Sequence, residues 1–405
     1  MKNTIIESII IINLILSPFC WGKYSGGTGE PNDPYLIATA EDLNSIGLDP
    51  NDWDKHFLMT ADINMTGHLE YNIICGESSG GWYAEFQGVF DGNEHTVSNL
   101  EIDAGRSMAG LFGYIGIGGV IKNIFLQTIS VKGIHYVGGV AGRNEGKILN
   151  CHVSGMIEGD QACGGITGYC CSTQAEIREC SFRGQVHGTY STGGIVGGTD
   201  SPEISGCYAF ADINGVSQCG GIVGHNTGGN LNRCFVKGSV TCAQCSGGFV
   251  GITYDHCGFG GEIRDCYADV IVHCSNEAGG FSGSVPGDGE IRNCYCYGRV
   301  VYDENNYTDI GAFIGEDRIP HGVFSSYFLD TAGPDNGFGE PLSSMQMQMR
   351  AIFADAGWDM VNVWDIGENQ TYPFLRAHLP SDINKDGETN LYDLAILALN
   401  WLEEY

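Results

Sequence analysis

The residues best suited to chemistry lie near the C-terminus, where oxygen-bearing side chains recur at short intervals. The stretch from Asp382 to Asp393 has Asp or Asn at positions 1, 3, 5, 9 and 12, Gly387 at position 6 and Glu388 at position 7. Calcium takes six to eight oxygen ligands, and a glycine at position 6 allows the sharp turn that gathers them. The spacing predicts a calcium cofactor held by Asp382, Asn384, Asp386, Glu388, Asn390 and Asp393. A solvated acidic turn is the alternative.

The residues after this loop have the spacing of one helical face. Leu391, Leu394, Ala398 and Trp401 follow one another at intervals of three or four residues, which is typical of an amphipathic helix. Residues 380–405 therefore predict a calcium loop followed by one short helix.

Catalysis on a sugar chain would need a pair of carboxylates about 5–10 Å apart. The acidic candidates in the middle of the chain are Asp160, Glu179, Asp212, Asp265 and Asp269. Only Asp265 and Asp269 are close in sequence, and Asp265 directly precedes a predicted strand, where surface acids are common. The sequence therefore gives no firm catalytic pair.

Basic and thiol side chains offer two further candidates. Arg178, Arg264 and Arg292 each stand two residues before a cysteine, so they share one position of a repeat and could grip uronates or pair with acids on a solvated face. Cys242 and Cys245 form a Cys-x-x-Cys motif, which is a weak signal for redox chemistry or zinc. Stacking of Cys242 over Cys274 favours plain packing or a disulfide.

A glycine repeat must position the acidic, basic and thiol candidates in the middle of the chain. Gly-Gly-apolar-x-Gly occurs eight times between Ala109 and Gly315, counting two degenerate copies, and its second position advances by 29, 26, 29, 27, 27, 32 and 32 residues. The strands between the copies alternate apolar and polar residues. One such unit cannot bury a core alone, whereas stacked units cover each other. The fold class predicted is all-β, a parallel β-solenoid of about 8–10 coils with small capping segments and a short C-terminal calcium-loop helix. Glycines are expected at the corners, because they accept positive φ.

Stacked coils place equivalent residues directly above one another, about 4.8 Å apart. An inward column is expected to hold buried thiols, or at least one disulfide between coils, at Cys151, Cys180, Cys207, Cys234, Cys266 and Cys294. The next column points outward and carries Tyr208, Phe235, Tyr267 and Tyr295. An exposed ladder of rings would stack on sugar rings, so these four residues are the candidate ligand-binding site. Packing of the rings beneath a cover is the alternative.

The chain divides into five predicted segments. Residues 1–22 resemble a secretory signal peptide, since a short apolar stretch follows Lys2 and ends before Gly22. Residues 23–87 form an N-terminal cap, 88–332 the solenoid, 333–379 a C-terminal cap and 380–405 the calcium-binding tail. Within the caps we expect strands at 34–37 and 56–65 and helices at 40–46 and 342–354. The core is expected to be closed by Trp358, Trp364, Tyr372 and Phe374.

The charge of the chain limits its partners. Asp and Glu number 49 against 19 Lys and Arg, so the net charge is −30. Such a surface repels nucleic acid and anionic lipid, and after signal removal no apolar stretch approaches the length of about 18 residues that spans a bilayer. We expect no nucleic acid partner, no membrane insertion, and a secreted, extracellular or cell-surface location.

The repeats resemble the GLUG family, whose unit reads roughly Gly-Gly-aliphatic-Val-Gly followed by Ile-x-Asn-Cys and an aromatic residue. Gly220 to Gly224 with Leu231 to Phe235 is a close match, and Ile291 to Tyr295 is another. The resemblance covers about residues 109–331. It implies the solenoid fold of exported bacterial surface proteins and is nearly silent about activity.

The tail resembles a type I dockerin repeat, because Asp393 stands at position 12 and one helix follows. This resemblance implies a cohesin-type module as partner and attachment to a scaffold or cell surface. A full dockerin carries two such repeats, whereas this chain has one, and Thr389 replaces the usual apolar residue.

Together these features favour a secreted or cell-surface, non-catalytic protein that binds or displays. We expect it to associate with carbohydrate or matrix and to be tethered through its calcium-binding, dockerin-like tail. The alternative is a β-helix polysaccharide lyase or glycoside hydrolase, so the sequence leaves enzymatic activity open and leans against it.

Overall fold

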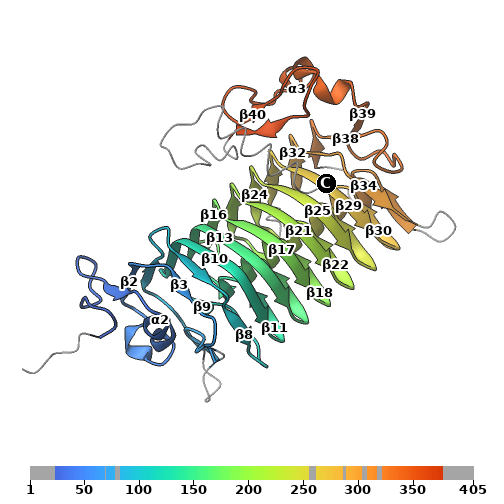
Figure 1. The fold of residues 1–405 in the computed structure, drawn as a ribbon. Coiled ribbons are helices and arrows are strands. Elements are labelled where there is room, and N and C mark those ends of the chain that lie inside the picture. The colour runs from blue at the N-terminus through green and yellow to red at the C-terminus, as the bar shows by residue number, and fades with distance from the viewer. Residues whose placement is uncertain are drawn as a thin grey trace, which may run out of the picture.

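The computed structural model describes residues 23–68, 70–77, 83–254, 261–285, 289–302, 308–316 and 322–376. These residues form an elongated stack of coils, with the residues after β38 (Tyr327–Leu329) folded over one end (Figure 1). The predicted fold class is confirmed: the chain is all-β, and its parallel sheets form a β-solenoid of about eight turns. The predicted signal peptide and calcium-binding tail, 1–22 and 380–405, lie outside the described residues.

Three parallel sheets make the walls of the solenoid. One coil passes along β12 (Ala141–Asn144), β13 (Lys147–Glu158) and β14 (Gln161–Gly164), one strand in each sheet. Each strand pairs in parallel with its counterpart in the next coil, so that His152 lies opposite Ser181 in the register. Equivalent residues are thereby stacked from coil to coil, in continuous register from β13 to β29.

The first wall, which we call the long sheet, contains 22 strands within the described residues. Its remaining strands are β1 (Tyr35–Ile37), β2 (His56–Met59), β3 (Ile63–Asn64), β6 (Val89–Asp91), β7 (Thr96–Ser98), β8 (Glu101–Asp103), β10 (Val120–Lys132), β16 (Glu176–Arg178), β17 (Ser181–His187), β20 (Glu203–Ser205), β21 (Tyr208–Asn214), β24 (Asn230–Asn232), β25 (Phe235–Thr241), β28 (Glu262–Arg264), β29 (Tyr267–His273), β32 (Glu290–Arg292), β33 (Tyr295–Cys296), β34 (Arg299–Val301), β37 (Val323–Phe324) and β39 (Glu340–Leu342).

In the part of the chain that the structure describes, the other two walls contain seven and eight strands. The seven-stranded sheet is completed by β11 (His135–Gly138), β18 (Tyr190–Gly193), β22 (Ser217–Gly220), β26 (Gln244–Gly247), β30 (Asn276–Gly279) and β35 (Thr308–Gly311). The eight-stranded sheet is completed by β9 (Phe112–Ile115), β15 (Thr167–Cys171), β19 (Val196–Asp200), β23 (Val223–Thr227), β27 (Val250–Tyr254), β31 (Ser282–Ser284) and β36 (Ile314–Glu316). Two antiparallel pairs stand apart, β4 (Gly76–Glu77) with β5 (Tyr83–Ala84) and β40 (Trp364–Asp365) with β41 (Phe374–Leu375).

The N-terminal segment joins the solenoid directly. β1 pairs in parallel with β2, and β2 pairs with β6, so the long sheet already begins within the predicted cap. Helix α2 (Ala40–Ile46) forms where it was predicted, because Thr39 and Asp42 make a capping box at its start. A 3-10 turn, η1 (Pro50–Asp52), follows. The predicted strand at 56–65 is divided into β2 and β3.

The C-terminal segment is less helical than expected. In place of a helix over 342–354 the chain has the end of β39, a 3-10 turn η2 (Gln346–Gln348) and the short helix α3 (Arg350–Asp355). Met349 between the last two has extended dihedrals, φ −102° and ψ 107°, and this interrupts the helix. The described helices are all too short or too polar to cross a membrane.

The motif glycines are required for close packing rather than for positive φ. A Cβ placed on Gly165 would lie 2.1 Å from Cγ of Phe182 and 2.2 Å from the carbonyl oxygen of Gly194. Left-handed backbone instead occurs at the residue before each inward cysteine, for example at Asn150 (φ 49°) and Arg233 (φ 53°). The expected role of the motif glycines is therefore corrected: they admit neighbouring chains. The corner before the inward cysteine is turned by polar residues and, at Gly206 (φ 62°), by a glycine outside the motif.

The core fills the interior of the coils with stacked, equivalent side chains. Phe249, Phe281 and Phe313 stack at centroid distances of 4.8 and 5.0 Å. The six cysteines of the predicted inward column are all fully buried, so their orientation is confirmed. At the C-terminal end Asn336 donates from Nδ2 to the carbonyl oxygens of Ile314 and Gly315, at 2.8 and 3.1 Å. Its side chain thereby satisfies part of an otherwise open strand edge.

Candidate functional site

A column of aromatic rings runs along the outer face of the long sheet. Tyr208, Phe235, Tyr267 and Tyr295 open β21, β25, β29 and β33, and the parallel register places them directly above one another. Neighbouring rings lie 5.2, 5.0 and 5.2 Å apart between centroids, with interplanar angles of 4°, 6° and 19°. The predicted candidate residues are therefore brought together as one continuous stack, which we call the aromatic column.

The chain's own C-terminal residues cover most of this column. Trp364 of β40 is fully buried, and its ring centroid lies 6.1 Å from that of Tyr267 and 6.0 Å from that of Tyr295. The hydroxyl of Tyr295 donates to the carbonyl oxygen of Pro373. Residues 342–376, which we call the C-terminal cap, lie over one end of the stack of coils (Figure 1). Their buried apolar side chains form a second hydrophobic cluster with the column.

The covering changes the interpretation of the candidate ligand site. Tyr295 is 1% exposed, and Phe235 and Tyr267 are each 7% exposed, whereas Tyr208 is half-buried at the edge of the cap. The expectation of an exposed ring ladder is thus corrected for three of the four residues, because β40, β41 and their flanking residues pack on them. The stated alternative, packing beneath a cover, describes these three.

Asp265, one of the acidic candidates, is part of the contact with the cap. It is 7% exposed, and its Oδ1 accepts hydrogen bonds from Trp364 Nε1 at 3.0 Å and Asn293 Nδ2 at 3.2 Å. Its backbone has a positive φ of 52°. The carboxylate is therefore held in a structural contact between coil and cap.

The other acidic candidates lie on the outer surface. Asp269 of β29 is 3.5 Å from Lys237 Nζ, and Asp212 accepts a hydrogen bond of 2.5 Å from the Ser239 hydroxyl on the next coil. Asp160 and Glu179 are exposed. These contacts run between neighbouring coils, so they tie the stack together along its length.

The arginine column forms ion pairs with acids of its own strands. Arg178 lies 3.5 Å from Glu176, and Arg292 lies 3.0 Å from Glu290. Arg264 lies 3.7 Å from Glu262. Of the two alternatives considered for this column, the geometry favours a solvated ladder of ion pairs.

The cysteines of the described residues are free thiols. Burial raises the pKa of the Cys163 and Cys170 thiols to about 12, and it raises the pKa of Cys180 well above its usual value. The Cys242 and Cys219 thiols are hydrogen-bonded, and this bond lowers the pKa of Cys242. Thiols buried in apolar surroundings are poor nucleophiles, so the fully buried inward column behaves as packing.

Of the two predicted metal-binding motifs, the structure describes the Cys-x-x-Cys motif and not the calcium loop. Within the described residues, no group of three or more His, Cys, Asp or Glu side chains could hold a metal ion, and this includes the Cys242–Cys245 motif. Cys245 instead donates to Glu277 Oε2 at 2.6 Å. The six predicted calcium ligands, Asp382, Asn384, Asp386, Glu388, Asn390 and Asp393, lie outside the described residues.

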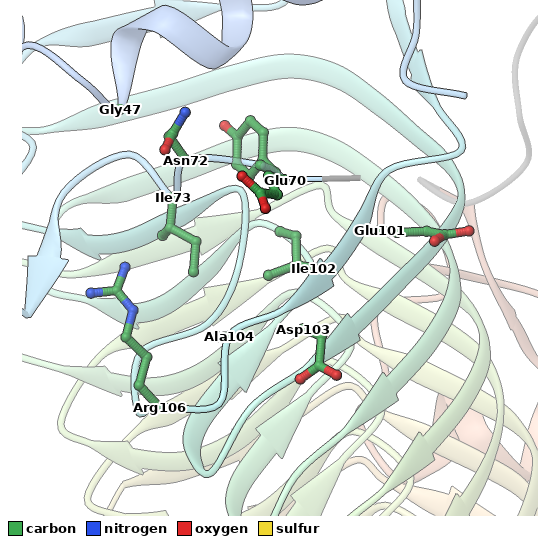
Figure 2. A pocket seen from close by; sticks show the side chains of 10 residues that line it. Gly47, Glu70, Asn72, Ile73, Glu101, Ile102, Asp103, Ala104 and Arg106 are labelled. Carbon is green, nitrogen blue, oxygen red and sulfur yellow. The ribbon is translucent and has the colours of Figure 1, made fainter. Parts of the chain in front are cut away.

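A pocket that the sequence did not indicate lies where the N-terminal segment meets the first coil. It has a volume of about 330 Å³, and its charged lining residues are Glu70, Glu101, Asp103 and Arg106. Figure 2 shows Glu70 and Asp103 on opposite sides of Ile102, with Glu101 directed away from the other labelled side chains. These residues come from two separate segments and belong to no motif, so no local pattern could have revealed them. The acidic lining favours small cationic or polar molecules.

Comparison with known proteins agrees with this architecture. Residues 133–157 match the family described as the GLUG motif. Halomucin from Haloquadratum walsbyi is 37% identical over 150 residues, which is 35% of this chain and 2% of halomucin. A protein provisionally named a Gly-rich membrane protein, from Evansella cellulosilytica, is 32% identical over 134 residues, 32% of this chain and 15% of the relative. The chain thus spans only a small part of the length of these curated relatives.

A solved structure is similar over nearly the whole length. It is a Bacteroides ovatus protein with the provisional description of an immunoglobulin A1 protease, and it superposes with a TM-score of 0.50 and 20% identity. The match covers 88% of this chain and 96% of that one. At this identity the likeness concerns the fold alone. Sequence and structure together identify the chain as a β-helix protein that carries the GLUG motif.

Proposed function

We propose that this chain is a secreted or cell-surface protein that binds or displays and does not catalyse a reaction. The observation that carries the proposal is the unbroken register of the long sheet from β13 to β29. Over these strands every coil presents the same outward positions directly above those of the coil before. A rigid face with a period of about 4.8 Å suits an extended, repetitive partner.

A carbohydrate or matrix polymer is the partner class that we favour. The net charge of −30 disfavours polyanions such as nucleic acid. Half-exposed rings at the edge of the cap, together with the polar side chains of the long sheet, could contact sugar rings and hydroxyls. The names of the two curated relatives, a halomucin and a membrane protein, support a place at the cell surface.

The predicted calcium loop would supply the tether. Its ligand spacing supports calcium binding, and its resemblance to a dockerin repeat supports a cohesin-type module as the partner. A polysaccharide lyase or hydrolase remains the alternative, but the proposed acid Asp265 is engaged by Trp364 at 3.0 Å, which supports the non-catalytic function.

One incubation separates binding from catalysis. The full chain is mixed with a panel of neutral and acidic polysaccharides, and both the retained fraction of protein and the released reducing or unsaturated ends are measured. We expect retention on one or more polymers without new ends. Product release that is lost in an Asp265→Asn or Asp269→Asn variant would contradict the proposal.

Calorimetry with calcium tests the tether. The full chain should release heat of binding, and Asp382→Ala should abolish it because one of the loop's oxygen ligands is lost. Glu403→Ala is a matched control, since it removes the same charge from the same tail outside the loop. A full chain that shows no calcium-dependent heat would refute the calcium assignment.

A further inference from the structure

Two cysteines from neighbouring coils meet at the corner between the long sheet and the seven-stranded sheet. Cys219 is the third residue of β22, and Cys242 follows β25, just before the next strand of the same wall. The two thiols are hydrogen-bonded, and the backbone N–H of Cys219 also donates to Cys242 Sγ. Cys219 is 0% exposed and Cys242 is 4% exposed. The two sulfur atoms are therefore neighbours inside the protein.

A glycine makes room for this contact. The N–H of Gly215 donates to the carbonyl oxygen of Thr241 at 2.9 Å, so Gly215 occupies the same corner as Cys242, one coil earlier. A Cβ placed on Gly215 would lie 2.4 Å from Cys219 Sγ. Because Gly215 has no side chain, Cys219 Sγ reaches into the space next to the following coil, where it meets Cys242.

The geometry of a disulfide favours this pair over cysteines stacked in one column. Equivalent residues of neighbouring coils lie about 4.8 Å apart, whereas a disulfide joins Cβ atoms about 3.5–4.5 Å apart. Cys242 and Cys274, the pair that the sequence indicated, stand in such a column, and Cys274 donates to the carbonyl oxygen of Asn276 at 3.0 Å. Cys219 and Cys242 occupy different positions of the repeat, so the coil spacing does not hold them apart.

We infer that Cys219 and Cys242 form a latent cross-link, a disulfide that ties one coil of the solenoid to the next. The structure holds both residues as thiols. Their oxidation would close residues 219–242, one whole coil, into a covalent ring. Since a coil of a solenoid otherwise contacts only its neighbours, the ring would fix the rod near its middle. The proposed location outside the cell is one in which disulfides persist.

The reaction needs a small-molecule disulfide as the oxidant. The hydrogen bond from Cys219 lowers the pKa of Cys242, so Cys242 is the attacking thiolate. It attacks one sulfur atom of the oxidant, forms a mixed disulfide and releases one small thiolate. Cys219 then gives up its proton, attacks Cys242 Sγ and releases the second thiolate. The protein thiols lose two electrons and two protons, and the oxidant leaves as two small thiols.

Peptide mapping of the oxidised chain tests the cross-link. Because both thiols are buried, the full chain is incubated with oxidised glutathione in urea well below the unfolding transition, where the corner opens locally. Remaining thiols are alkylated, and the digested chain is analysed by mass spectrometry. We expect the peptides of Cys219 and Cys242 to be recovered joined in most molecules. Recovery of both as alkylated thiols, or of Cys242 joined to Cys274 or Cys245, would overturn the proposal.

Two glycine variants test the geometry without removing a thiol. In Gly215→Ala the new Cβ takes the space of Cys219 Sγ, so the cross-linked fraction should fall at least about tenfold. Gly188→Ala is the matched control, because Gly188 occupies the same corner one coil earlier and its Cβ would lie 2.3 Å from Thr192 Oγ1. This variant should keep the cross-link. Equal losses in the two variants would contradict the assigned role of Gly215.

Unfolding in urea tests what the cross-link does. The oxidised chain should unfold at a higher urea concentration than the reduced chain, because the ring restricts the unfolded state. Cys219→Ala should abolish this difference. Cys163→Ala, at the same position of the repeat two coils earlier, should leave it intact. Equal midpoints of the oxidised and reduced chains would refute a coil-closing disulfide. These measurements use neither polysaccharide nor calcium, so their failure would leave the proposed function untouched.

Discussion

The contact between Trp364 and Asp265 allows a quantitative test of how the cap is attached. Trp364 is fully buried, and its N–H is 3.0 Å from a carboxylate that is itself 7% exposed. Trp364→Phe keeps a ring over the column but removes this donor. A hydrogen bond to a charged group contributes about 1.5–3 kcal/mol, and the smaller ring leaves a cavity that costs about 1 kcal/mol more. We expect the free energy of unfolding to fall by about 2.5–4 kcal/mol.

The matched control is the neighbouring tryptophan. Trp358 is 4% exposed and donates from Nε1 to the carbonyl oxygen of Ser325 at 2.9 Å, a neutral acceptor. Because a neutral hydrogen bond contributes about 0.5–1.5 kcal/mol, Trp358→Phe should cost about 1.5–2.5 kcal/mol. Urea unfolding followed by circular dichroism gives both values.

A double-mutant cycle isolates the charge. In an Asp265→Asn background the acceptor is neutral, so the cost of Trp364→Phe should drop towards that of Trp358→Phe. Equal costs of Trp364→Phe in the two backgrounds would refute the reasoning that the cap is anchored by a charge-assisted hydrogen bond.

Three further predictions concern the solenoid. Gly165→Ala should destabilise the chain by more than about 2 kcal/mol in urea unfolding, because its Cβ would lie 2.1 Å from a ring carbon of Phe182. Gly289→Ala is the control and should cost clearly less, because the nearest atom to its Cβ would be 3.3 Å away. Equal losses of stability in the two variants would contradict the packing argument. Burial lowers the pKa of His152, so the unfolded chain takes up a proton near pH 6.5 that the folded chain does not. The free energy of unfolding should therefore fall as the pH drops below about 7 and level off beneath the pKa of His152 in the folded chain. His152→Gln should weaken this pH dependence. A pH profile of the unfolding midpoint that is the same in the variant would contradict the role of His152. Thiolate-specific labelling at pH 8 should spare the inward cysteine column in the native chain and reach it in guanidinium, as mass spectrometry of the labelled peptides can show; labelling of these residues in the native chain would mean that they are not buried.

Much of the fold follows from the sequence because it repeats. The near-constant spacing of the glycine motif fixes the coil, and the alternation after each cysteine fixes which residues point inward, as the full burial of Cys180 illustrates. The same register places Tyr208 above Phe235 in the stack. These features depend on local periodicity, which a single sequence displays.

The features that the sequence did not reveal are contacts between segments that lie far apart in the chain and do not belong to the same repeat. The bond between Trp364 and Asp265 spans 99 residues, so the burial of the aromatic column by the cap could not be read from either segment. The pocket between residues 70–73 and 101–106 has the same origin. The role of the motif glycines was misjudged for a different reason, because close approach of neighbouring coils, as at Gly165, is a property of the stack.

Hydroxyl-radical footprinting tests most directly whether the cap covers the aromatic column. The full chain carries its own references, since Met345 is 74% and Tyr190 is 48% exposed. The structure predicts that Tyr267, Tyr295 and Trp364 are oxidised far more slowly than these two. Oxidation of Tyr295 and Trp364 at the rate of Tyr190 would contradict the covered column and would reopen the outer face of the long sheet as a ligand site.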